Sequence, residues 1–110
     1  MVERLRRIIE PFESDESIMF AAIYTIDGTP LVTHIKDRKY IPVVEWMERQ
    51  IDVVSRQIME DRLDSVEFRL GGEGILFRPL SGGLILVVGT SDETSLYKLR
   101  VDTETLRRMV

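Results

Sequence analysis

One long helical pattern constrains the fold of this chain more than any other feature: residues 41–60, with the sequence IPVVEWMERQIDVVSRQIME. At about 100° of rotation per residue, its apolar side chains gather on roughly half of the helix surface. These side chains are Val43, Val44, Trp46, Met47, Ile51, Val53, Val54 and Ile58. A surface helix needs an apolar stripe only somewhat wider than 100°. We therefore expect this helix to contact its own sheet and a further surface.

The apolar half of this helix separates into two groups. We expect one group to face the sheet: Val43, Met47, Val54 and Ile58. The other forms a rim along one flank: Trp46, Gln50, Val53 and Gln57. Two glutamines in an otherwise apolar stripe favour a contact between helices, where amides pair across an interface, and Trp is a frequent interface anchor. The alternative is that the rim only borders a wide core-facing stripe.

The composition fits one globular domain over residues 1–110, because 44% of the residues are hydrophobic and 31% are charged. The absence of cysteine excludes disulfides and thiolate catalysis. A net charge of −4 argues against a general nucleic-acid binder. The first residues, MVERLRRIIEP, lack a hydrophobic signal core, and the longest apolar run, LILVVG, is too short to cross a bilayer. We expect a cytoplasmic protein without membrane insertion.

Before the long helix, the pattern predicts one short helix and two strands. Residues 2–10 have apolar side chains at helical spacing, and Pro11 is expected to stop that helix. Residues 18–25, IMFAAIYT, are almost continuously apolar, which is typical of a central strand covered on both faces. The hairpin pair Asp27-Gly28 leads into a more peripheral strand at residues 30–35.

After the long helix, which should end within residues 61–63, residues 64–70 alternate between apolar and charged side chains. Val66 and Phe68 share one face with Leu70, so this segment has the pattern of an edge strand. The glycine-rich residues 71–74 are expected to turn the chain into a strand at residues 75–80.

The last predicted elements are a second central strand, LILVVG at residues 84–89, and a C-terminal helix. That helix runs from Leu96 towards Val110 and should be irregular around residues 101–103, which are poor helix formers. The order is therefore α-β-β-α-β-β-β-α, an α+β fold with a five-stranded antiparallel sheet. Two central strands buried on both faces require helices on both sides of the sheet.

This order of elements resembles the roadblock/dynein light-chain family, in particular its prokaryotic MglB-like members. YTIDGTPLVT is similar to the first hairpin of the family, and GGEGILFRPLSGGLILVVGT is similar to its last three-strand segment. A short N-terminal helix and the polar TSDETS before the last helix depart from the family pattern. The resemblance implies a profilin-like strand order of 2-1-5-4-3, with the long helix on one face and the two terminal helices on the other.

The resemblance also implies a homodimer, in which the long helices pack together and the third strands join two sheets. The interface residues would be Trp46, Gln50, Val53, Gln57, Val66 and Phe68. Family members commonly bind small Ras-like GTPases, so we expect a non-enzymatic protein that scaffolds or regulates such a GTPase. Rim charges govern specificity, which makes the charged helix face the candidate partner-binding surface: Glu45, Glu48, Arg49, Asp52 and Arg56.

The sequence offers little material for catalysis or cofactor binding. His34 is the only histidine and is expected to point outward from its strand. The glycine-rich residues 71–74 precede a strand and lack the Lys and Ser/Thr of a phosphate loop, so no cofactor, metal or catalytic residue is expected. The alternative functions are a small-molecule-sensing domain, for which the core offers few convergent polar groups, and a purely structural assembly subunit.

Arginines near both ends of the chain form a further feature. If the two terminal helices are neighbours, a basic patch would include Arg4, Arg6, Arg7, Arg107 and Arg108. The simpler interpretation is a solvated helix face.

Overall fold

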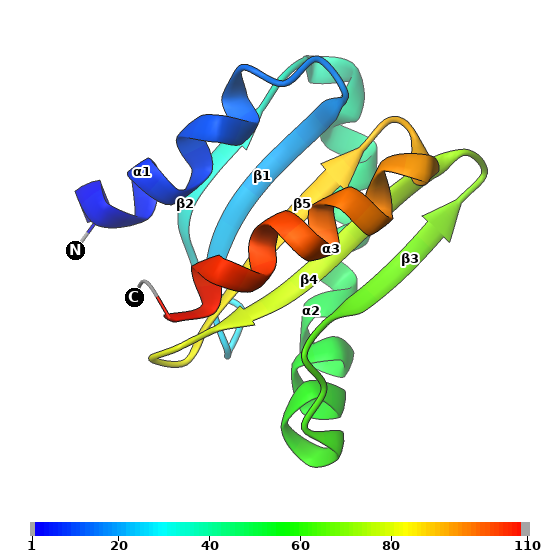
Figure 1. The fold of residues 1–110 in the computed structure, drawn as a ribbon. Helices are drawn as coiled ribbons and strands as arrows, with labels where there is room; N and C mark the ends of the chain where they lie inside the picture. The colour runs from blue at the N-terminus through cyan, green and yellow to red at the C-terminus, as the bar shows by residue number, and fades with distance from the viewer. Residues whose placement is uncertain (1, 109–110) are drawn as a thin grey trace.

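The computed structural model describes residues 2–108. Its helices are α1 (Val2–Glu13), α2 (Ile41–Asp61) and α3 (Leu96–Glu104), and its strands are β1 (Ile18–Thr25), β2 (Pro30–Ile35), β3 (Val66–Leu70), β4 (Glu73–Leu80) and β5 (Leu84–Thr90). Short 3-10 turns lie at Arg38–Tyr40, Glu93–Ser95 and Thr105–Arg108. This order confirms the predicted α+β succession of elements (Figure 1).

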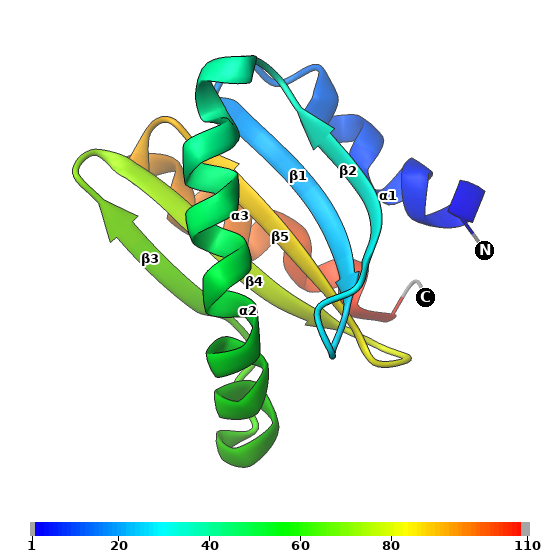
Figure 2. The same ribbon diagram turned by 180° about the vertical axis from the view of Figure 1, so that it is seen from behind.

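The five strands form one antiparallel sheet in the order β2-β1-β5-β4-β3, as expected. The apolar strands β1 and β5 lie side by side in the centre, with Ala22 opposite Val87. Helices α1 and α3 cover one face, and α2 crosses the other (Figures 1 and 2). Both central strands are therefore covered on both sides, which explains why their sequences do not alternate.

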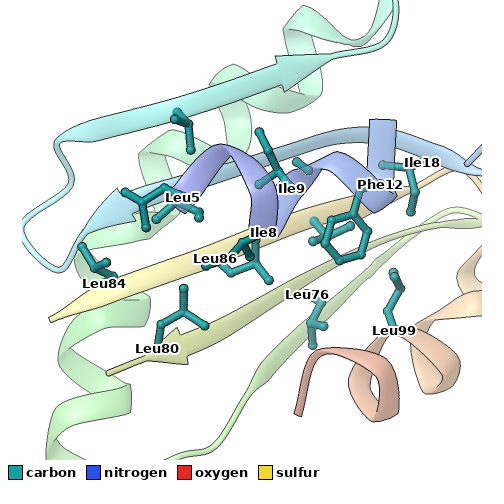
Figure 3. Packing of buried hydrophobic residues seen from close by; sticks show 14 of the residues in the cluster. Leu5, Ile8, Ile9, Phe12, Ile18, Leu76, Leu80, Leu84, Leu86 and Leu99 are labelled. Carbon is teal, nitrogen blue, oxygen red and sulfur yellow. The ribbon is translucent and has the colours of Figure 1, made fainter. Parts of the chain in front are cut away.

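Two apolar clusters fill the space on either side of the sheet. Successive side chains of a strand point to opposite faces, so Ala21 and Ile23 of β1 join the cluster under α1 and α3, whereas Phe20 and Tyr24 join the cluster under α2. Figure 3 shows the first cluster, in which side chains from α1, α3 and the sheet pack together: Leu5, Ile9, Phe12, Leu76, Leu86 and Leu99.

Helix α1 is longer than predicted, because it continues past Pro11 to Glu13. Proline removes one intrahelical hydrogen bond, but it lies in the last turn of this helix. The burial of Phe12 against the sheet holds that turn in place.

The C-terminal helix is also more regular than predicted, because residues 101–103 are helical and the change to a 3-10 turn comes at Thr105. Thr103 is buried, and its hydroxyl donates to the Leu99 carbonyl at 2.7 Å, which satisfies a polar group that would oppose burial. Val110, which the predicted helix included, lies outside the described residues.

Two local predictions at glycine and histidine are wrong. Only Gly71 and Gly72 form the turn between β3 and β4, since Gly74 pairs with Arg69 inside the ladder. A Cβ at position 74 would lie 2.7 Å from the Leu96 side chain, so this glycine permits the close approach of α3.

His34 is half-buried opposite Ala21, because β2 lies beside α1 on that face. Its Nε2 atom is buried and has no hydrogen-bond partner in the described structure.

None of the helices among residues 2–108 combines the length and the apolar character that a membrane crossing requires.

Candidate interaction surface

Helix α2 is the element around which the candidate site is built. Pro42 in its first turn needs no amide partner there, and the helix ends at Asp61. The next residue, Arg62, has a left-handed conformation (φ 54°), which turns the following amide, that of Leu63, back to the Ile58 carbonyl at 3.2 Å. The C-terminal part of α2 projects beyond the end of the sheet (Figure 2). The sheet therefore covers only part of the apolar half of this helix.

The buried side of α2 is close to the predicted one. Its buried side chains are Val44, Met47, Ile51, Val54, Ser55 and Ile58. Met47, Val54 and Ile58 thus face the sheet as expected, whereas Val43 is only half-buried. The centre of the buried stripe is rotated towards Ile51, so Val43 lies at the flank.

The predicted rim has two halves with different surroundings. Trp46 is half-buried, and its ring meets Phe68 of β3 edge to face, with 5.4 Å between ring centroids. Gln50 is also half-buried, and its side-chain amide donates to the Trp46 carbonyl at 3.2 Å. By contrast, Val53 is 49% exposed and Gln57 is exposed. The rim is therefore packed against its own chain at Trp46 and open to solvent at Val53.

Strand β3 is an edge strand, as its alternating sequence predicted, and pairs with β4 on one side only. Val66 and Phe68 are half-buried and pack beneath α2. The other edge of β3 presents backbone amides and carbonyls that can pair with another strand. The structure thus places the six predicted interface residues on two adjoining elements.

The predicted partner-binding residues all lie exposed on α2: Glu45, Glu48, Arg49, Asp52 and Arg56. Three of them have partners within the chain. Asp52 and Arg56 form an ion pair at 2.8 Å, and Glu48 accepts a hydrogen bond from the buried Tyr24 hydroxyl at 2.7 Å. Burial, together with the hydrogen bond to Glu48, raises the pKa of Tyr24 above its ordinary value. Glu48 therefore also fixes α2 to β1.

The sequence pattern of the AF0774-like protein family matches residues 2–104. The chain belongs to this family. Comparison with curated proteins gave no match.

Solved structures share the fold of this AF0774-like protein. The gliding protein MglB from Thermus thermophilus is 16% identical, with a TM-score of 0.68 over 98% of this chain and 89% of that chain. A Roadblock/LC7 domain from Streptomyces avermitilis is 13% identical, with a TM-score of 0.51 over 81% and 84% of the two chains. The fold is thus of the roadblock type, as the sequence resemblance implied.

A third solved structure is described as MglB with a tetrameric arrangement. It is 17% identical to this chain, with a TM-score of 0.61 over 98% of this chain and 85% of that chain. Self-association is therefore on record for a protein of this fold.

Three exposed apolar residues near α2 were not among the predicted interface residues. Met59 is 64% exposed, Ile41 is 41% exposed and Leu63, just after the helix, is 36% exposed. Met59 lies outside the apolar half of the helix, so helical periodicity did not identify it. Met59 faces solvent from the other half of the helix, whereas its neighbour Ile58 is buried against the sheet.

Proposed function

We propose that this AF0774-like protein is a single, non-enzymatic roadblock-type domain that forms a homodimer and binds a small Ras-like GTPase, which it scaffolds or regulates. The observation that carries the proposal is the position of an exposed apolar helix flank next to an unpaired edge strand. Val53 is exposed on α2, and β3 is the last strand of the sheet beside it.

A homodimer would cover both the exposed flank of α2 and the free edge of β3. The α2 helices of two protomers would pack along the rim, where Val53 supplies apolar area and the amide of Gln57 is exposed for pairing. The β3 strands would pair edge to edge and so satisfy backbone groups that solvent now contacts. A homodimer with a two-fold axis uses the same patch on both protomers, as this arrangement requires.

The charged face of α2 would then form the platform for the GTPase. Glu45 and Arg49 are exposed and have no ion pair or hydrogen bond from their side chains within the described residues. Such free charges favour encounter with a charged partner and select among partners. The sequence resemblance to the roadblock family supports a Ras-like GTPase as that partner.

Affinity capture with defined nucleotide states tests the GTPase assignment. Immobilised protein is incubated with native lysate of the source organism in GDP or in a non-hydrolysable GTP analogue, and retained proteins are identified by mass spectrometry. We expect a Ras-like GTPase to be retained preferentially in one nucleotide state. The variant Arg49→Glu should retain less of it, whereas Arg6→Glu, on the opposite face, should behave as wild type.

Absence of a Ras-like GTPase in both nucleotide states would contradict the assignment. Retention of unrelated proteins alone would favour the purely structural assembly subunit.

A further inference from the structure

A groove lies between α1 and α3, on the face of the sheet opposite α2. Its volume is about 490 Å³, which is within the size range of small-molecule sites. Its apolar lining comes from both helices and from the 3-10 turn that follows α3, and includes Ile8, Phe12, Leu99 and Leu106. Figure 3 shows Ile8, Phe12 and Leu99 in this region above the sheet. The lower parts of these side chains belong to the core, so the groove has a fixed apolar floor.

Charged side chains are distributed unevenly around this groove. Helix α1 contains three arginines and three glutamates, yet only Arg4 and Arg7 among them line the groove. Residues three apart lie on the same flank of a helix, so these two guanidinium groups belong to one wall. Arg7 forms no hydrogen bond or ion pair within the described chain. At Arg7 this wall therefore presents a positive charge that forms no ion pair with any described residue.

The remaining charges of the groove are largely balanced within the chain. Lys98 and Asp102 on α3 form an ion pair at 3.2 Å. Asp15, past the C-terminal end of α1, accepts hydrogen bonds from the Ser17 amide at 2.9 Å and from the Ser17 hydroxyl at 2.8 Å. The groove is thus positive near the start of α1 and carries a carboxylate at its other end.

We propose that this groove binds a free long-chain carboxylate, with its head group at Arg7 and its hydrocarbon tail over the apolar floor. At the far end Lys98 is paired with Asp102, and Asp15 adds a carboxylate, so a ligand with one charged end, placed at Arg7, fits the groove. The chain as a whole carries a net charge of −4 and repels anions. The local arginines are therefore what allows an anion to bind. This site lies on the face opposite α2 and does not depend on the proposed dimer or GTPase.

Calorimetry with two matched amphiphiles tests the proposal. Decanoate and decyltrimethylammonium have the same hydrocarbon tail and opposite head-group charge, and both are titrated into the full chain below their micelle concentrations. We expect decanoate to bind at least about tenfold more tightly, since a charge-assisted contact is lost with the cation. Equal affinities would show that the tail alone partitions onto an apolar surface, and would overturn the proposal.

Two charge-reversal variants on the same helix provide the matched comparison. Arg7→Glu should weaken decanoate binding by about tenfold or more, whereas Arg6→Glu, which does not line the groove, should change it by less than about twofold. Equal losses in both variants would indicate only a long-range effect of net charge and would overturn the assignment of the head group. Wild-type-like binding by Arg7→Glu would overturn it as well.

Methyl NMR locates the bound ligand, and a vesicle assay distinguishes a free carboxylate from a membrane surface as the anion source. Decanoate should shift the methyl signals of Ile8, Leu99 and Leu106 and leave those of Val53 and Met59 unchanged; the reverse pattern would contradict the site.

Sedimentation with anionic phosphatidylglycerol vesicles should show no binding beyond that of neutral vesicles. Binding to these vesicles without binding to decanoate would overturn the proposal in favour of a membrane surface.

Discussion

The indole ring of Trp46 on α2 meets the phenyl ring of Phe68 on β3 edge to face, with 5.4 Å between ring centroids. Phe68 in turn contacts the fully buried Phe77 of β4, with 5.7 Å between centroids. A row of three aromatic rings therefore runs from the core to the flank of α2. Both predicted interface residues in this row stabilise the protomer itself, so their loss affects the fold as well as any dimer.

Alanine at Trp46 or Phe68 should lower the free energy of unfolding by about 2–3 kcal/mol each, because both side chains are half-buried. The double variant should lose less than the sum, with a coupling of about 0.5–1.5 kcal/mol typical of an edge-to-face pair. Urea denaturation at one fixed protein concentration measures these values. The exposed Tyr97→Ala is the control and should cost under about 1 kcal/mol. Strict additivity would contradict a direct contact.

Tyr24 should make stability fall at alkaline pH. Its pKa is raised in the folded protein, so in the unfolded chain it loses its proton near its ordinary value of about 10 while the folded protein retains it. The unfolded state then binds fewer protons, and stability decreases as pH rises above that value. Thermal unfolding from pH 8 to pH 11 should show a steeper loss for wild type than for Tyr24→Phe. Parallel curves would exclude this role of Tyr24.

Replacing Glu48 measures how much the Tyr24–Glu48 hydrogen bond contributes to stability while the tyrosine itself is kept. Glu48→Ala leaves the buried Tyr24 hydroxyl without its acceptor and should cost about 1–3 kcal/mol. Glu45→Ala, an exposed carboxylate of the same helix with no such contact, should change stability by less than about 0.5 kcal/mol. Equal effects, measured by urea denaturation, would mean that the Tyr24–Glu48 contact contributes nothing to stability.

Among the charged residues, Arg78 of β4 should cause the largest loss of folding stability when it is replaced. It is 1% exposed, and its guanidinium donates to the Asp64 and Arg100 carbonyls at 2.6 Å each and to the Thr103 hydroxyl at 3.1 Å. It also pairs with Glu104 at 3.1 Å. Burial lowers the pKa of Arg78, and the negative charge of Glu104 opposes that shift.

Arg78→Ala should destabilise the protein by about 3–5 kcal/mol, because it removes the donor of the buried Thr103 hydroxyl and of two partly buried carbonyls and leaves a cavity beneath α3. Arg78→Lys should restore only part of this loss, since a lysine cannot reproduce the planar set of donors. Glu104 is half-exposed, so Glu104→Gln should cost under about 1 kcal/mol. Chemical denaturation measures all three, and a stable Arg78→Ala protein would contradict the anchoring role.

Most of the sheet could be predicted from the sequence, because continuous and alternating apolar patterns distinguish its central strands from its edge strand. IMFAAIYT and LILVVG are the central strands β1 and β5, and the alternating β3 is an edge strand. Helix ends were less predictable. Pro11 is tolerated because Phe12 is buried, which is a tertiary effect that local rules do not contain.

The candidate site was only partly predictable, because periodicity places a residue on a helix face but does not show what covers it. Trp46 and Val53 lie on the same flank by sequence, yet Trp46 packs on Phe68 while Val53 is exposed. The groove beside Arg7 depends on the spacing between α1 and α3. These are long-range features of the assembled chain.

The mass of the protein in solution tests the central claim most directly. At tens of micromolar, light scattering after size exclusion should give twice the 12.8 kDa of the chain. Val53→Glu combined with Gln57→Glu should give 12.8 kDa with an unchanged circular dichroism spectrum, because both side chains are exposed in the protomer. Val101→Glu, an exposed position on α3, should remain dimeric. A wild-type mass of 12.8 kDa under these conditions would contradict the account.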